Sequence, residues 1–110
     1  MAATTELLKI SRIMSLLRDV HVDFPATAIH CLLTVMAEEG ITQMEVAQRI
    51  NMPKSTCSRN MRLLSPRLGP DKEGMGLIEL RVDPMDYRHK GAYLTPKGVE
   101  LREKIKELMQ

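Results

Sequence analysis

Apolar residues recur at helical spacing near both ends of the chain. Residues 4–20 carry one wide apolar face, formed by Leu7, Ile10, Ile13, Met14 and Leu17. Residues 95–110 begin with Thr95-Pro96, a typical helix start, and carry a narrower stripe of Leu101, Ile105 and Leu108. We therefore predict terminal helices over 4–20 and 95–110. The first has more apolar surface than one contact requires, which favours a partner subunit.

Between these ends, the pattern predicts three more helices. One begins near Pro25, ends at Gly40 and faces the core with Ile29, Leu32, Leu33 and Met36. The next begins with a capping box of Thr42 and Glu45. Asn51 follows it, and asparagine tolerates a left-handed turn. Pro53 then suits the first turn of a further helix.

This further helix, up to Leu64, separates its residues by face. Cys57, Met61 and Leu64 share one stripe, whereas Ser55, Arg59 and Arg62 lie opposite, flanked by Thr56 and Ser58. Packing through the first stripe would present hydroxyls and guanidiniums outward, and these groups suit base edges and phosphate oxygens. Residues 42–64 are thus predicted to form a helix-turn-helix.

Period-two alternation is confined to the last third of the chain. Residues 77–82 (LIELRV) are predicted to form a strand and residues 91–94 its short return strand, with residues 83–90 as an exposed tip. Residues 68–76 are rich in turn formers and are predicted to form a loop. The fold class is therefore mainly α with a small two-stranded β wing over 77–94, a winged helix-turn-helix.

Charge supports a nucleic-acid interpretation of this fold. Five basic residues and no acidic one lie between Val46 and Pro70, although the whole chain carries only +2: Arg49, Lys54, Arg59, Arg62 and Arg67. A solvated helix face is the alternative, because most charge runs are no more than that. The helix-turn-helix spacing favours DNA binding.

Composition limits the other possibilities. A chain of 110 residues suits a single domain, 1–110, and no apolar run is long enough to cross a membrane. Scarce aromatic residues argue against stacking of single-stranded bases. No signal peptide is recognised, so we expect an intracellular, cytoplasmic protein. No nucleophile–base pair, glycine-rich phosphate loop or carboxylate pair stands out, so no catalytic residue and no cofactor is predicted.

The two cysteines are interpreted as core residues. Cys31 and Cys57 both lie within apolar helical patterns, and burial opposes the thiolate that a reactive cysteine needs. Oxidation of Cys57 would disturb the recognition helix, so a redox sensor remains the alternative. His30 and Cys31 point about 100° apart on a helix, which disfavours a shared metal ion. No metal site is predicted.

Two segments resemble the MarR family of winged-helix transcription regulators. They are TQMEVAQRINMPKSTCSR, residues 42–59, and DPMDYRHKGAYLTPKG, residues 83–98. Asp86 and Arg88 of the wing, with the Leu-Thr-x-x-Gly that follows, are the discriminating part. Asn60 replaces a usually apolar residue. The loop after residue 64 is longer than in the family by roughly eight residues, an insertion of a kind that loops tolerate.

The resemblance implies a homodimer in which the terminal helices interleave at the two-fold axis. Recognition helices would enter successive major grooves while the wings reach minor grooves. By this analogy, DNA is contacted from the helix by Ser55, Thr56, Ser58, Arg59 and Arg62, and from the wing by Arg88. Asp86 would hold Arg88 instead, or in addition.

The sequence therefore predicts a dimeric, sequence-specific regulator that binds double-stranded DNA at a near-palindromic operator. Lys54 and Lys90 are added as phosphate contacts, with Lys90 and Arg67 equally balanced between function and solvation. Two alternatives stay open. One is a winged-helix module that binds a polymerase or replication protein, and the other is a regulator that responds to a redox signal or to an unidentified small-molecule effector.

Overall fold

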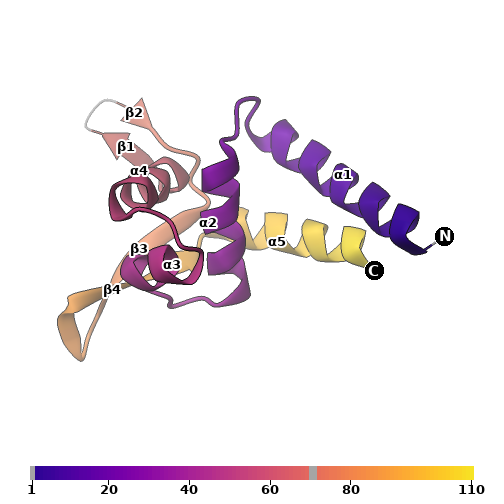
Figure 1. The fold of residues 1–110 in the computed structure, drawn as a ribbon. Coiled ribbons are helices and arrows are strands. Elements are labelled where there is room, and N and C mark those ends of the chain that lie inside the picture. The colour runs from indigo at the N-terminus through magenta and orange to yellow at the C-terminus, as the bar shows by residue number, and fades with distance from the viewer. Residues whose placement is uncertain (1, 70–71) are drawn as a thin grey trace.

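Figure 1 shows the computed structural model of the chain, which describes residues 2–69 and 72–110. The described elements follow one another as α1 (Ala2–Val20), α2 (Ala26–Ala37), α3 (Gln43–Arg49), α4 (Lys54–Leu64), β1 (Arg67–Gly69), β2 (Lys72–Glu73), β3 (Ile78–Asp83), β4 (Asp86–Leu94) and α5 (Pro96–Met109). Strands β1 and β2 form one antiparallel hairpin, and β3 and β4 form another. The predicted winged helix-turn-helix is confirmed.

Local signals in the sequence set the helix boundaries. The Thr42 side chain accepts a hydrogen bond from the backbone N–H of Glu45, and the Glu45 carboxylate accepts one from the N–H of Thr42, both at 3.1 Å. This capping box satisfies two donors that the start of α3 would otherwise leave unpaired. Asn51 has φ 52°, the left-handed conformation that lets the chain turn into α4. Thr95 caps α5 through the N–H of Gly98 at 3.1 Å.

The core lies where α2, α4 and the base of the wing meet. Its fully buried members include Leu32 and Val35 on α2, Met61 and Leu64 on α4, and Ile78 on β3. Leu101 and Ile105 join it from α5, as their stripe predicts. Leu33 does not join it. Its side chain is 39% exposed, because it lies about 100° around the helix from Leu32, which points into the core.

Helices α1 and α5 form an arm, the helical arm, that extends away from the core (Figure 1). The Lys9 ammonium donates to the Met109 carbonyl at 3.3 Å, so the end of α5 lies beside the middle of α1. The molecule is elongated as a result, with extents of 49 × 29 × 26 Å. Among the described helices, none has both the length and the apolar character needed to span a membrane.

The loop predicted over 68–76 is wrong at its first half. Strands β1 and β2 form a short hairpin there, with Arg67 opposite Glu73. The chain after this hairpin returns along the end of α4, where the carbonyls of Leu63 and Leu64 accept from the N–H groups of Met75 and Leu77, both at 2.8 Å. The last carbonyls of a helix lack partners within the helix. Pairing with them orders a segment whose composition indicates only turns.

The exposed tip predicted over 83–90 is also too long. Strand β4 begins at Asp86 rather than at residue 91, and only Pro84 and Met85 turn between the strands. Val82 pairs with Lys90, so the ladder continues through charged residues. Charged residues are weak strand formers in isolation, and the pairing with β3 overrides that preference.

Candidate nucleic-acid interface

Helix α4 separates a buried face from an exposed basic face, as the sequence predicts. Cys57, Met61 and Leu64 have exposed fractions of 1% or less. Lys54, Ser55, Arg59 and Arg62 are exposed, and Thr56 and Ser58 are half-buried beside them. Six of the eight predicted contact residues therefore lie on the outer side of one helix. Asn60 is the exception to the pattern, because it is 6% exposed and packs with the core.

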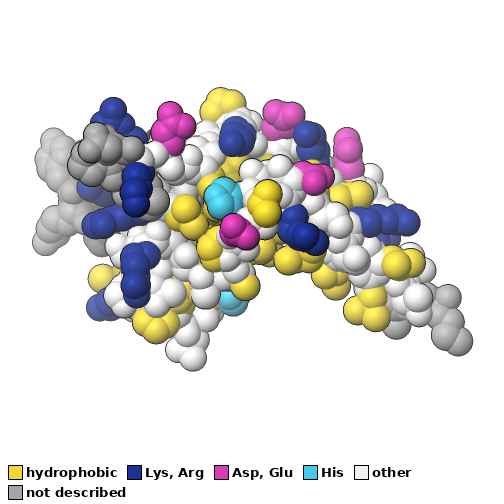
Figure 2. All heavy atoms as spheres, turned by 90° about the horizontal axis from the view of Figure 1, so that it is seen from above, with side chains coloured by type: hydrophobic (Ala, Val, Ile, Leu, Met, Phe, Trp, Pro, Cys, Tyr) yellow, Lys and Arg dark blue, Asp and Glu magenta, His cyan; other side chains and the backbone are white. Residues whose placement is uncertain are grey.

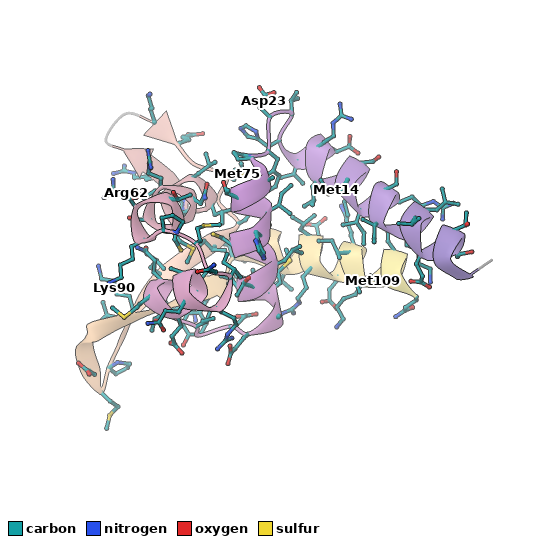
Figure 3. The ribbon with its side chains drawn as sticks, in the orientation of Figure 1. Met14, Asp23, Arg62, Met75, Lys90 and Met109 are labelled. Carbon is teal, nitrogen blue, oxygen red and sulfur yellow. The ribbon has the colours of Figure 1, made fainter. Side chains whose placement is uncertain are left out.

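The exposed side chains of α4 are aimed away from the rest of the protein. Figure 3 shows Arg62 on the side of α4 opposite to α2, with its guanidinium directed outward. The Arg59 side chain folds along the helix, where its Nε donates to the Ser55 carbonyl at 3.4 Å. The remaining guanidinium nitrogens of Arg59 have no partner among the described residues, so they are available to an acceptor outside the chain.

Ion pairs divide the basic residues into two groups. Outside α4, six described cations have carboxylate partners: Lys9 with Glu6, Arg49 with Glu38, Arg81 with Glu79, Arg102 with Glu39 and Glu103, Lys104 with Glu100, and Lys106 with Glu103. Within the part of the chain that the structure describes, no carboxylate pairs with Lys54, Arg59, Arg62, Arg67, Lys72 or Lys90. All three cations of α4 are thus without a carboxylate partner, although unpaired cations also lie on the helical arm, at Arg12, Arg18 and Lys97 among the described residues.

Arg49 is the exception within the predicted basic run. Its guanidinium pairs with the Glu38 carboxylate at the end of α2. The local charge of +5 over residues 46–70 therefore overstates the positive surface by one. The sequence did not predict this ion pair, because Glu38 lies before the basic run. The turn at residues 38–42 places Glu38 beside Arg49.

The wing is tied to the start of the helix-turn-helix by backbone hydrogen bonds. The N–H of Gly40 donates to the Ala92 carbonyl, and the N–H of Ala92 donates to the Ile41 carbonyl, both at 2.8 Å. A side chain at residue 91 would place its Cβ 2.8 Å from the Gly40 carbonyl oxygen, so only glycine permits this approach. The position of the wing relative to α4 is therefore set by direct contact.

This attachment places one predicted wing residue on the side of the molecule that carries the exposed face of α4. Lys90 is exposed on β4, and Figure 3 places it on the same side of the molecule as Arg62, away from the helical arm. The side chain of Arg88, the other predicted wing contact, lies outside the described residues. Its role, and the alternative that Asp86 holds it, stay predictions.

The β1–β2 hairpin adds two cations that the loop prediction did not place. Arg67 and Lys72 are both exposed, on paired strands that follow the end of α4. Figure 2, seen from above, shows Lys and Arg side chains gathered at this end of the molecule. The sequence analysis counted Arg67 but missed Lys72. A loop without defined strand pairing does not indicate on which side of the molecule a side chain lies.

The two cysteines lie together beneath this surface. Both are fully buried, Cys31 on α2 and Cys57 on α4. Burial, reinforced by the neighbouring Cys57 thiol, raises the pKa of Cys31 to about 12, and burial also raises the pKa of Cys57. Thiols this far from ionisation are unreactive towards oxidants at neutral pH. The interpretation of the cysteines as core residues thus agrees with their burial.

Comparison with known proteins shows which solved structures have a similar fold. No family model matches the sequence, and no curated protein sequence matches it. Solved structures do match. An S. aureus MepR mutant bound to an oligodeoxyribonucleotide is 23% identical with a TM-score of 0.71, covering 96% of this chain and 71% of that one. MarR is 27% identical with a TM-score of 0.63, covering 90% and 71%.

A third match, a MarR transcriptional regulator from Methanosarcina mazei Go1, is 20% identical with a TM-score of 0.63, covering 89% of this chain and 71% of that one. The helix-turn-helix and its attached wing define a winged-helix protein. Within that class, the chain has the fold of the MarR-type regulators, helical arm included. The resemblance predicted from residues 42–59 and 83–98 is confirmed at the level of the fold.

Proposed function

We propose that this protein is a transcriptional regulator that binds double-stranded DNA as a homodimer at a near-palindromic operator. The observation that carries the proposal is the division of the charges. The winged-helix fold exposes one recognition helix, α4, and no carboxylate among the described residues pairs with any of its three cations, whereas Arg49, Arg102 and Lys104 elsewhere are paired. Two of the similar structures, both of MepR, are complexes with DNA, which supports the same assignment.

Each predicted contact residue has a chemical role in this proposal. Arg59 and Arg62 read base edges in the major groove, since a guanidinium can donate two hydrogen bonds to one guanine. Ser55, Thr56 and Ser58 supply hydroxyls to bases or phosphates. Lys54 and Lys90 bind phosphates, which gives affinity without sequence preference. Arg88 would reach the adjacent minor groove from the wing.

The homodimer rests on the exposed apolar face of α1. Leu7 is 66% exposed, Leu8 52%, Ile10 56% and Met14 41%. Large apolar side chains that gather on one helix are typical of a protein–protein interface. A second copy is the natural occupant, because a two-fold pair would present two recognition helices to half-sites about 10 bp apart.

The test is selection of duplexes from a random pool, followed by binding of the selected and a scrambled duplex at several salt concentrations. We expect a palindromic sequence to be enriched and the affinity to fall steeply with salt, with a slope of about −0.9 for each phosphate contact. Arg59→Ala should reduce the preference for the selected duplex by about 1–3 kcal/mol, while non-specific affinity changes less.

Lys106→Ala serves as the matched control, because Lys106 is an exposed cation on α5 that pairs with Glu103. This variant should bind both duplexes as the wild type does. Equal loss in the two variants would mean that overall charge, not the face of α4, governs binding. Absence of any duplex affinity at low salt would reject the proposal and favour a protein-interaction module.

A further inference from the structure

Three sulfur atoms meet beneath the helix-turn-helix. The Cys31 thiol on α2 donates to the Met52 thioether sulfur at 3.6 Å, and Met52 lies in the turn between α3 and α4. The Cys57 thiol, in the first turn of α4, lies close enough to Cys31 for each thiol to affect the pKa of the other. The sulfurs therefore come from α2, from the turn of the helix-turn-helix and from α4, and they lie close together.

We propose that Cys31, Met52 and Cys57 form a binding site for Cu(I), with three sulfur ligands in a trigonal arrangement. Thiolates and thioethers are soft ligands, and a site made only of them selects Cu(I) over the hard divalent ions. Three sulfurs that each lie about 2.3 Å from one ion are about 4 Å apart from each other. The 3.6 Å between Cys31 and Met52 is close to this spacing.

The ligand set excludes the commoner metals. Structural zinc takes four ligands from cysteine, histidine or carboxylate. In the described residues no group of three or more His, Cys, Asp and Glu is placed to hold an ion. His30 is exposed, whereas Cys31 beside it is buried, so the neighbouring imidazole faces away. The thioether is the remaining soft donor beside the thiols, since the Gln43 carbonyl, 3.6 Å from the Cys57 sulfur, is a hard oxygen donor. A thioether is a poor ligand for magnesium or calcium, and it is not among the usual ligands of zinc in proteins.

Binding is an exchange of protons for the metal, with no change in oxidation state. Two S–H bonds break, at Cys31 and Cys57, and both protons leave to solvent. Three Cu–S bonds form, to the two thiolates and to the Met52 sulfur. The occupied site then carries one negative charge. Asn60 lies beside it, with its amide nitrogen 3.9 Å from the Met52 sulfur, and supplies a polar donor in an otherwise apolar core.

The position of Met52 provides access for the ion. Both cysteines have no exposed surface, but Met52 is only half-buried and its neighbours Asn51 and Pro53 are exposed. The turn is therefore the side from which Cu(I) reaches the thiols. Once bound, the ion links α2 to α4 through the turn, so it stabilises the unit that carries the recognition helix.

The experiment is an anaerobic titration of the whole protein with Cu(I) against a chromophoric Cu(I) chelator, with X-ray absorption of the loaded protein. We expect one Cu(I) per chain, three sulfur scatterers, and a thermal midpoint that rises on loading. Two protons are displaced when Cu(I) binds. At pH values below the pKa of the thiols, the affinity for Cu(I) should therefore rise by about 100-fold for each unit by which the pH is raised.

Variants separate the three ligands from general effects. Cys31→Ser and Cys57→Ser should each abolish competition with the chelator. Met52→Leu keeps the volume and should lose at least about tenfold in affinity, since even supporting residues of metal sites cost that much when removed. Met75→Leu is the control, because Met75 is a buried methionine before β3 that has no contact with the thiols among those described.

Several results would overturn the site. Failure of the wild-type protein to compete with the chelator for Cu(I) would do so. So would a Met52→Leu variant that binds Cu(I) as tightly as the wild type, or a Met75→Leu variant that loses as much Cu(I) affinity as Met52→Leu does. If the serine variants do not fold, Met52→Leu and the count of sulfur scatterers still decide. DNA binding plays no part in this titration, so its outcome is independent of the proposed function.

Discussion

Shortening Ile10 to alanine tests whether the helical arm forms the dimer. Ile10 lies on the outer face of α1, with 56% of its side chain exposed in the single chain. Alanine is the best helix former, so Ile10→Ala leaves α1 intact and removes only apolar surface. The variant should therefore weaken the association of two chains much more than it affects the fold.

The expected magnitude follows from the exposed fraction. The substitution removes three carbon atoms, each worth about 0.8 kcal/mol when it is fully buried. Scaled by the 56% of the side chain that a partner can still cover, the loss is about 1.3 kcal/mol per copy. Two-fold symmetry places the change on both chains, which gives about 2.7 kcal/mol, or about a 100-fold rise in the dimer Kd.

Sedimentation equilibrium over a range of protein concentrations measures this Kd directly. Met85→Ala is the control, because Met85 is 92% exposed at the tip of the wing, at the other end of the molecule from the arm. It should leave the Kd unchanged. A wild-type chain that stays monomeric at all concentrations, or an Ile10→Ala variant with the wild-type Kd, would refute the argument from the exposed face.

Two further predictions concern stability. Thr42→Ala removes the side-chain half of the capping box with Glu45 and should lower the free energy of unfolding by about 1 kcal/mol, measured by urea denaturation. Stability should also fall at alkaline pH. Burial raises the pKa of Cys31 from 9.0 to about 12. Between these pH values the thiol ionises in the unfolded chain but stays protonated in the fold, so the free energy of unfolding falls as pH rises. Urea midpoints measured across this range should fall less steeply for Cys31→Ala, and equal slopes would contradict the effect of burial.

Signals between residues close in sequence were interpreted correctly. Thr42 with Glu45, Asn51, and Thr95 with Pro96 all act within one helical turn, and the structure has each in its predicted conformation. The division of α4 into two faces was also predictable, because a helix places every fourth residue on the same side regardless of what surrounds it.

Pairings between distant segments could not be predicted in this way. The hairpin of β1 and β2 depends on carbonyls at the end of α4, and the start of β4 depends on the ladder with β3. The ion pair of Arg49 and Glu38 has the same character. The carbonyl partners and the ion pair join residues more than ten positions apart. The start of β4 pairs with nearby residues of β3, but the register of that ladder is not specified by the local pattern.

The sequence by itself determined the type of each main helix, the basic face of α4 and the resemblance to MarR-type regulators, because periodicity and capping are local properties of the chain. Only the tertiary structure decided which cations remain unpaired, how far the wing extends, and that α1 keeps Leu7 and Ile10 outside the core. It also brought Cys31, Met52 and Cys57 together. Charge pairing, exposure and clustering all depend on which surfaces meet, and that is set by the packing of the helices rather than by the spacing of residues along them.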